Sequence, residues 1–293
     1  MAAPGNPWVL AARPQTLWVA VSAVLVGSAL AVHDGAFRLD VFLLTMGAAL
    51  LIQVGVNYAN DYSDGVRGTD TAERIGPRRA VASGLIAPGR MRAGIVAVFG
   101  AAAVLGAILA FISGPWVIAI GAASILAALG YTGGPRPYGY AGLGELSVFI
   151  FFGPVATVGT RYVYDGAVTA AAWVGAVMIG LLSTAILVAN NLRDIGTDTA
   201  AGKNTLAVRL GPARTRTLYT ATVYGAFAAT AVGAAARWSP PWTALALLAL
   251  PLAVVAVRIV TTAADGPTFI KGLVATARLQ ILTAALFSLG AIV

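Results

Sequence analysis

Long apolar runs separated by short polar turns extend along almost the whole of this chain. Many of the runs reach about 20 residues, the length that an α-helix needs to cross the hydrocarbon core of a lipid bilayer. Turns such as Asp34-Gly35 and Ser113-Gly114-Pro115 separate them. The pattern predicts nine helices, at residues 14–32, 41–60, 91–112, 115–131, 143–162, 168–191, 213–235, 242–261 and 271–292. We therefore predict an all-α polytopic membrane protein with nine transmembrane helices, folded as a single domain over residues 1–293.

Composition supports a membrane protein and argues against a soluble domain. Of the 293 residues, 59% are hydrophobic and only 10% are charged, and the mean hydropathy is +0.84. The net charge of +8 does not indicate a nucleic-acid partner, because the basic residues are not clustered on one soluble face. The chain has no cysteine and a single histidine, His33, so a bound cation would need oxygen ligands.

The Lys and Arg residues are unequally divided between the two sides of the predicted bundle. One side carries only Arg38, Arg161 and Arg237, and nearly all the others fall on the side of the N-terminus. By the positive-inside rule, the side rich in Lys and Arg faces the cytoplasm. We expect a multi-pass protein of the inner (plasma) membrane, with a cytoplasmic N-terminus and the C-terminus outside. Cytoplasmic loops are expected at about residues 61–90, 132–142 and 193–212.

The scarce acidic residues gather at the ends of two predicted helices. Of the 11 acidic residues, five occur there: Asp61, Asp64 and Asp70 after the second apolar run, and Asp194 and Asp198 after the sixth. We expect Gly65 and Gly68 to break the first of these helices and to let the following loop fold back over a bound headgroup.

Carboxylates three or four residues apart share a helix face and repel one another, by roughly 0.2–0.5 kcal/mol per pair in water. A divalent cation between them would remove this repulsion, and Mg²⁺ is commonly held by one or two carboxylates together with phosphate oxygens. The pattern therefore predicts a magnesium–diphosphate site with metal ligands Asn60, Asp61, Asp64, Asp194 and Asp198. Contacts to the diphosphate are predicted for Asn57, Asn60, Arg67, Asp70, Asn190, Asn191, Arg193 and Lys203. The alternative is that both clusters are simply solvated helix ends.

Two motifs resemble the aspartate-rich motifs of the UbiA superfamily of intramembrane prenyltransferases: Asn60-Asp61-x-x-Asp64 and Asp194-x-x-x-Asp198. The general superfamily pattern has a third acid four residues after Asp64, where this chain has Gly68 and then Asp70. That form is typical of the MenA branch. The same branch is indicated by Ala12-Arg13-Pro14-x-Thr16-Leu17, Arg74-Ile75-Gly76-Pro77, Tyr131-Thr132-Gly133-Gly134 and the segment from Gly202 to Gly211.

The resemblance implies a helix bundle around a central cavity that acts as a Mg²⁺-dependent 1,4-dihydroxy-2-naphthoate polyprenyltransferase of menaquinone synthesis. Such an enzyme transfers a polyprenyl group from polyprenyl diphosphate to 1,4-dihydroxy-2-naphthoate with loss of CO₂ and diphosphate, giving demethylmenaquinone. The catalytic residues implied are Asp61, Asp64, Asp194 and Asp198. Residues implied to stabilise the allylic cation or to contact the aromatic substrate are Arg13, Gln53, Tyr62, Tyr131, Arg136, Tyr138, Tyr140 and Glu145. The prenyl tail would enter from membrane lipid, no nucleic acid is expected, and formation of a homo-oligomer is left open.

Several alternatives stand beside this interpretation. Within the superfamily, the acceptor could be another aromatic acid such as 4-hydroxybenzoate, or the enzyme could be of the decaprenyl-phosphoribose type. A cation-coupled secondary transporter, from a different class, could also bind ions at repeat-related helix ends. Glu145 either positions the aromatic substrate or transfers a proton, or it is an interfacial charge. Arg13 either binds a carboxylate or anchors the chain at the membrane surface, and Gln53 either faces the cavity or bridges helices.

Overall fold

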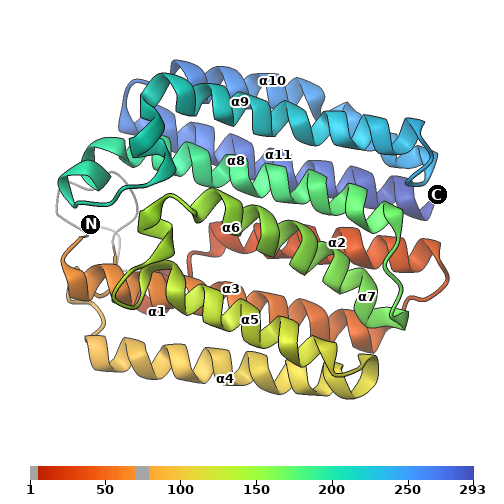
Figure 1. Cartoon of the computed structure of the whole chain (residues 1–293), viewed down its shortest axis with the longest axis horizontal. Coiled ribbons are helices and arrows are strands. Elements are labelled where there is room, and N and C mark those ends of the chain that lie inside the picture. Colours follow the sequence, from red (N-terminus) through yellow and green to blue (C-terminus); the bar gives the residue numbers. More distant parts are fainter. Residues whose placement is uncertain (1–5, 70–78) are drawn as a thin grey trace.

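The computed structural model describes residues 6–69 and 79–293, and every regular element within them is helical (Figure 1). The long helices lie roughly along one axis and form a single bundle (Figure 1). The α-helices are α1 (Pro7–Ala12), α2 (Pro14–His33), α3 (Leu39–Arg67), α4 (Pro88–Ser113), α5 (Trp116–Thr132), α6 (Gly144–Ile150), α7 (Gly159–Asp165), α8 (Ala170–Ala200), α9 (Leu206–Ala235), α10 (Leu250–Thr262) and α11 (Gly266–Ile292). Two 3₁₀ helices, η1 (Tyr138–Ala141) and η3 (Pro241–Ala249), and one π-helical segment, η2 (Phe151–Val158), complete them.

The membrane-spanning character of the bundle agrees with the apolar pattern of the sequence. In the described residues, eight helices are long and apolar enough to cross a membrane, with α6, η2 and α7 forming one of them and η3 with α10 another. The shorter apolar helix α5 has 17 residues and coincides with the run predicted at 115–131. At a rise of about 1.5 Å per residue it is at the lower limit for a span. The all-helical membrane fold is thus confirmed, while the count of nine spans stays a prediction.

The two helices that carry the acidic motifs are longer than predicted. Helix α3 continues through the first motif to Arg67, and α8 continues through the second to Ala200. Gly65 lies inside α3, so the expectation that it breaks the helix is wrong. Gly68 does end the helix, because it adopts the left-handed conformation with φ of 69°, which costs glycine little. The following loops therefore begin at Gly68 and Ala201 rather than at Asp61 and Arg193.

The last helix of the bundle, α11, packs against the first long helix, α2. The largest buried apolar cluster joins α2 and η2 to the five elements from α8 to α11, η3 included. The η2 segment approaches α8 closely at Gly153, where an added Cβ would lie only 2.6 Å from the carbonyl oxygen of Ala176. Pro154 lies within η2, and a proline inside a helix cannot donate the usual backbone hydrogen bond. This π-helical segment forms part of the wall of an internal cavity described below.

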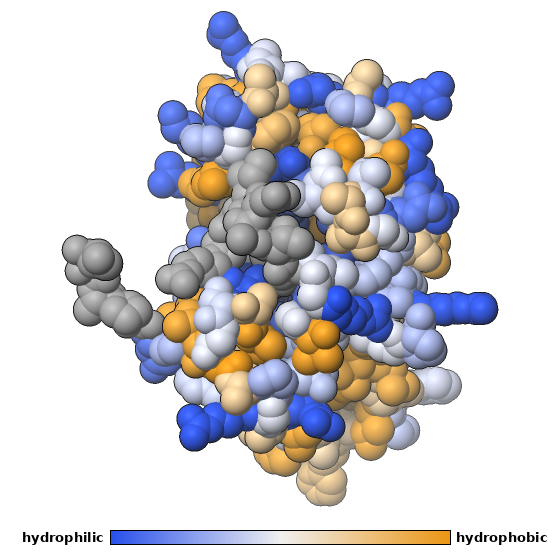
Figure 2. All heavy atoms as spheres, turned by 90° about the vertical axis from the view of Figure 1, so that its left-hand side faces the viewer, coloured by the Kyte–Doolittle hydropathy of each residue, from blue (hydrophilic) through white to orange (hydrophobic). Residues whose placement is uncertain are grey.

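Charge and aromatic residues mark the two ends of the bundle. Exposed basic residues occur at the end where α3 and α8 finish, and they include Arg67, Arg90, Arg92, Arg136, Arg209, Arg214, Arg258 and Lys271. Figure 2 views this end and shows hydrophilic side chains projecting around its rim. Four exposed tryptophans, Trp116, Trp173, Trp238 and Trp242, lie at the opposite end. Tryptophan is enriched at membrane–water interfaces, so these residues suit the boundary of the bilayer.

Candidate functional site

The ends of α3 and α8 face each other across a polar pocket of about 160 Å³. Both acidic motifs contribute to it, although they are separated by some 130 residues in the chain. The pocket brings together ten of the residues predicted from the sequence: Arg13, Asn60, Asp64, Tyr131, Tyr140, Asn190, Asn191, Asp194, Asp198 and Lys203. Residues of both motifs therefore line one pocket, and Asp64 and Asp194 in it are buried rather than solvated.

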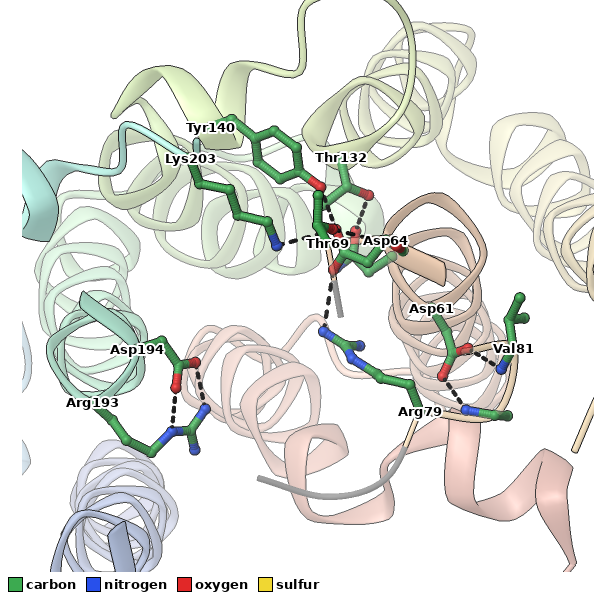
Figure 3. Close-up of polar contacts among 12 residues, drawn as sticks. Asp61, Asp64, Thr69, Arg79, Val81, Thr132, Tyr140, Arg193, Asp194 and Lys203 are labelled. Atoms are coloured by element: carbon green, nitrogen blue, oxygen red, sulfur yellow. Dashed lines mark hydrogen bonds and ion pairs between the residues drawn. The ribbon is translucent and has the colours of Figure 1, made fainter. Parts of the chain in front are cut away.

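The carboxylate of Asp64 has several partners in the pocket and is only 3% exposed. Its Oδ1 accepts hydrogen bonds from the hydroxyl of Tyr140, from Nζ of Lys203 at 3.4 Å and from the hydroxyl of Thr69 at 3.3 Å. Its Oδ2 lies 3.3 Å from Nη2 of Arg79 (Figure 3). A buried carboxylate is costly unless cations and donors surround it, and Asp64 has both.

Asp194 faces Asp64 from α8 and is held by its neighbour in the chain (Figure 3). Nε and Nη2 of Arg193 donate to its two carboxylate oxygens at 2.7 and 2.6 Å, a bidentate pairing. Asp198 follows one helical turn later on the same face and also lines the pocket. Arg193 does not line the pocket, and its guanidinium pairs with Asp194.

The amides of the pocket are fixed by other side chains. Oδ1 of Asn60 accepts from the hydroxyl of Thr132 at 2.8 Å. Nδ2 of Asn191 donates to Oε1 of Glu145 at 2.9 Å, and Glu145 is 6% exposed at the start of α6. Because a carboxyl oxygen accepts this bond from the NH₂ group, Oδ1 of Asn191 is the atom left for another partner. Glu145 thus lies behind the pocket wall rather than in the lining.

A larger apolar cavity of about 570 Å³ adjoins the polar pocket. It extends between α2, α3, α4, α5 and the Gly144–Asp165 helix, and its walls are mostly alanine, glycine and branched aliphatic side chains. Asn60, Tyr131 and Leu187 line both spaces, so the polar pocket and the apolar cavity adjoin at these residues. Gln53 lines this cavity, and it also donates to the Thr16 hydroxyl at 3.4 Å and so bridges α3 and α2. Its contact with the aromatic substrate stays a prediction.

Two tyrosines of η1 connect the loop after α5 to these spaces. Tyr138 lines the apolar cavity and donates to the carbonyl of Ala127 at 2.7 Å. Burial raises the pKa of the Tyr138 hydroxyl. For Tyr140, burial, the charge of Asp64 and the hydrogen bond to it raise the pKa well above the usual value of 10. The Tyr140 hydroxyl therefore stays protonated and remains a donor to Asp64. Nζ of Lys203 lies 4.7 Å from the centre of the Tyr140 ring, within range of a cation–π interaction.

Five other predicted residues lie outside the polar pocket. The carboxylate of Asp61 accepts from backbone N–H groups of a neighbouring turn. Asn57 donates to the carbonyl of Ala12 at 2.8 Å and to the Thr16 hydroxyl at 2.9 Å, which ties α3 to the α1–α2 junction.

The other three of these residues lie nearer the surface. Arg67 donates to the carbonyl of Gly134. Tyr62 lies beneath Arg92, and Arg136 is exposed. Asp70 lies outside the described residues.

Sequence reasoning missed several residues of the pocket. Arg79 reaches it from the far end of the loop after α3, and four threonines also line it, namely Thr69, Thr132, Thr197 and Thr205. In the sequence, the only feature that distinguishes Arg79 is its neighbour Arg78. Such a basic pair is also explained by the excess of Lys and Arg on that side of the bundle. Arg13 has φ of 49°, uncommon outside glycine, where the chain turns from α1 into α2 beside the pocket.

The donor set of the pocket suits a hard cation, although no cluster of acids could hold one alone. Carboxylate and amide oxygens of the kind that Mg²⁺ prefers come from both helices. Within residues 6–69 and 79–293, no three Asp, Glu or His side chains group closely enough to form a metal site by themselves. An ion bound here would therefore need oxygen ligands besides these acids, such as amide oxygens of the pocket, water or the oxygens of a bound ligand.

Comparison with known proteins decides the family. The model of the UbiA prenyltransferase family matches residues 20–288. This chain belongs to the UbiA prenyltransferase family. The 1,4-dihydroxy-2-naphthoate octaprenyltransferase of Mycobacterium tuberculosis is 48% identical over 249 residues, which are 84% of this chain and 83% of that protein. The protein of the same name from Escherichia coli is 38% identical over 297 residues, 97% of this chain and 94% of that one.

Solved structures of the UbiA family have the same fold. A UbiA homologue from Archaeoglobus fulgidus, bound to DMAPP and Mg²⁺, aligns with a TM-score of 0.64 at 13% identity, over 97% of this chain and 99% of that one. The predicted resemblance to the UbiA superfamily and its MenA branch is thus confirmed. Because the family consists of prenyltransferases, the transporter alternative is set aside.

Proposed function

We propose that this UbiA family member transfers a polyprenyl group from polyprenyl diphosphate to 1,4-dihydroxy-2-naphthoate, with loss of CO₂ and diphosphate. The relatives of that name at 38–48% identity support the choice of substrates. The observation that carries the proposal is the junction of the polar pocket with the apolar cavity at Asn60, Tyr131 and Leu187. A prenyl diphosphate has one charged end and one long apolar tail, and this pair of adjoining spaces matches both.

The polar pocket would bind the diphosphate through magnesium. Asp64, Asp194 and Asp198, assisted by Asn60 and Asn190, are the proposed ligands, and the diphosphate oxygens would complete the coordination. When bound, Mg²⁺ would stabilise the negative charge that develops on the departing diphosphate. The Mg²⁺-bound homologue from Archaeoglobus fulgidus is consistent with this ligand.

Two cations of the pocket would bind the diphosphate directly. Lys203 and Arg79 both contact Asp64, at 3.4 and 3.3 Å, so each lies at the edge of the proposed metal site. Their charges would neutralise phosphate oxygens and stabilise the leaving group more strongly as its charge grows. Arg13 lines the same pocket and is the proposed partner for the carboxylate of the aromatic acceptor.

The apolar cavity would hold the prenyl tail and exclude water from the reacting carbon. As the C–O bond to diphosphate breaks, the allylic carbon becomes positive, and the ring of Tyr131 at the junction would stabilise it. The naphthoate ring then forms a C–C bond at the carbon bearing its carboxylate. The bond to that carboxylate breaks, CO₂ leaves, and its electron pair returns to the ring. The product is the quinol form of demethylmenaquinone, because no oxidation accompanies the transfer.

We also propose that the site faces the cytoplasm. The exposed Lys and Arg residues at its end of the bundle support this orientation by the positive-inside rule. The tail would enter from the lipid, and the anionic acceptor would arrive from the cytoplasm, attracted by the basic rim.

Turnover by the purified protein tests the proposed substrates. A panel of acceptors would be offered together with polyprenyl diphosphates of several lengths, with and without EDTA. Prenylation of 1,4-dihydroxy-2-naphthoate that needs Mg²⁺ and is absent in Asp64→Ala and Asp194→Ala is the expected result. A preference for 4-hydroxybenzoate, or turnover retained in both variants, would contradict the proposal.

A further inference from the structure

The carboxylate of Asp61 is directed away from the polar pocket (Figure 3). Asp61 is 1% exposed, and each of its carboxylate oxygens accepts a backbone hydrogen bond: Oδ2 from the N–H of Ala80 at 3.0 Å and Oδ1 from the N–H of Val81 at 2.8 Å. Asp64, three residues later, lines the pocket, whereas Asp61 does not. The two acids of the first motif therefore have different surroundings.

The two N–H groups held by Asp61 belong to a compact turn at residues 79–86. Within the turn, the N–H of Ser83 donates to the carbonyl of Arg79 at 3.0 Å, and the N–H of Leu85 donates to that of Ala80 at 2.9 Å. The first N–H groups of such a helical turn have no partner inside it and need an outside acceptor. Asp61 supplies that acceptor from α3, in the way that an aspartate at a helix N-terminus does.

Gly65, one helical turn after Asp61, lets the turn approach α3 closely. A Cβ at Gly65 would lie 2.8 Å from Cγ1 of Val81 and 3.1 Å from the backbone nitrogen of Ala82, both closer than ordinary contacts. Any larger residue would therefore push the turn away from the helix. This close approach gives a reason for glycine inside α3, where it otherwise destabilises a helix.

Docking of the turn places Arg79 beside Asp64. Arg79 precedes the two residues that Asp61 holds, and its side chain reaches Oδ2 of Asp64 at 3.3 Å. The side chains of Arg79 and Asp64 are only 9% and 4% exposed, and both residues line the polar pocket.

We propose that Asp61 is a positioning residue rather than a magnesium ligand. Together with Gly65 it docks residues 79–86 on α3 and so places Arg79 where it binds the diphosphate. The inference rests on the proposed function only in taking diphosphate as the ligand of the pocket.

Ligand-induced stabilisation of the purified full-length protein separates the two roles without measuring turnover. Thermal unfolding would be followed while MgCl₂ is titrated at saturating inorganic diphosphate, and while diphosphate is titrated at saturating MgCl₂. For Asp61→Asn, the half-saturating Mg²⁺ concentration is expected to stay within about twofold of wild type. The half-saturating diphosphate concentration is expected to rise about tenfold, as it does for Arg79→Ala. In Asp64→Asn, the Mg²⁺ requirement itself should rise.

A double variant tests whether Asp61 acts through Arg79. If it does, adding Asp61→Asn to Arg79→Ala should raise the diphosphate requirement no further, because both changes remove the same contact. Arg79→Ala leaves the Asp61 hydrogen bonds intact, so it remains informative if Asp61→Asn does not fold. Independent, multiplicative effects of the two substitutions would overturn the proposal.

Gly65→Ala disturbs the docking without altering any charged group. It should raise the diphosphate requirement as Asp61→Asn does, and both variants should be cut faster by trypsin after Arg79. Gly89→Ala is the matched control, since an added Cβ there meets no atom within 4 Å, and it should behave as wild type.

An increase in the Mg²⁺ requirement of Asp61→Asn like that of Asp64→Asn, with unchanged cleavage after Arg79, would overturn the proposal. Absence of any stabilisation of wild type by Mg²⁺ and diphosphate would instead contradict the proposed ligand of the pocket. The rate of cleavage after Arg79 would then still decide whether Asp61 docks the turn.

Discussion

The hydroxyl of Tyr140 donates a hydrogen bond to Oδ1 of Asp64. This bond joins the 3₁₀ helix after α5 to the acidic end of α3, and Lys203 from the loop after α8 reaches the same carboxylate oxygen. Three segments far apart in the sequence thus meet at one atom. The position of Asp64 consequently depends on side chains that lie outside both aspartate motifs.

Removing the Tyr140 hydroxyl should weaken the site without unfolding the protein. Tyr140→Phe keeps the ring beneath Lys203 but removes the donor to Asp64. A hydrogen bond to a charged group contributes about 1.5–3 kcal/mol, so we expect kcat/KM for prenyl transfer to fall about 10- to 100-fold. Steady-state kinetics of the purified variant checks this. An unchanged kcat/KM would show that the bond does not support catalysis.

Lys203 should contribute mainly to binding of the diphosphate. Lys203→Met removes the charge that lies 3.4 Å from Asp64, and we expect KM for the prenyl diphosphate to rise about tenfold. Lys203→Arg, which retains the charge, should have a smaller effect. The control is Lys271→Met at the exposed start of α11, expected to stay within about twofold of wild type. Equal KM values for Lys203→Met and the control would argue against a role in binding.

Two roles for Glu145 can be distinguished: it orients the amide of Asn191, or it transfers a proton. If its role is to accept the hydrogen bond from Nδ2 of Asn191, Glu145→Gln can still accept that bond and should retain most activity. Glu145→Leu cannot, and its kcat/KM should fall about tenfold or more. Equal loss in both variants, measured in the same transfer assay, would indicate that the acid itself is needed.

The free space in the apolar cavity should limit the length of prenyl tail that the enzyme accepts. Gly106 lines the cavity, and a side chain added there enters open space. Gly106→Phe should reduce turnover of octaprenyl diphosphate about tenfold or more relative to geranyl diphosphate, because the ring occupies the path of a long tail. Gly100→Phe, on the exposed side of the same helix, is the control. Comparison of the two substrates in each variant gives the answer, and an unchanged preference in Gly106→Phe would place the tail elsewhere.

The helical fold could be predicted from the sequence because apolar runs of membrane length leave few alternatives. The pairing of the two motifs could also be predicted, since isolated carboxylates in so apolar a chain are costly unless they share a ligand. Helix ends were less predictable. Polar residues near Asp61 and Arg193 resemble loop sequences, yet α3 continues to Arg67 and α8 to Ala200. Only Gly68 carried a local signal for the end of α3.

The direction of individual side chains depended on contacts that the pattern of residues does not contain. Asp61 and Asp64 lie on nearly the same helix face, but only Asp64 lines the pocket. The carboxylate of Asp61 instead accepts hydrogen bonds from a turn some 20 residues further along the chain. Asn57 and Arg67 had the chemistry of diphosphate ligands, but backbone carbonyls of α1 and of the loop after α5 take their donors. Arg79 could not be predicted from the sequence, because it enters the site only through the docking of its turn on α3.

Release of CO₂ from the acceptor tests the central claim most directly. The purified protein would receive Mg²⁺, octaprenyl diphosphate and 1,4-dihydroxy-2-naphthoate labelled in its carboxylate. The account predicts one labelled CO₂ for each prenylated product, with neither formed in the presence of EDTA or by Asp64→Ala. Prenylation that leaves the carboxylate in the product, or no transfer to this acceptor while another aromatic acid is prenylated, would contradict it.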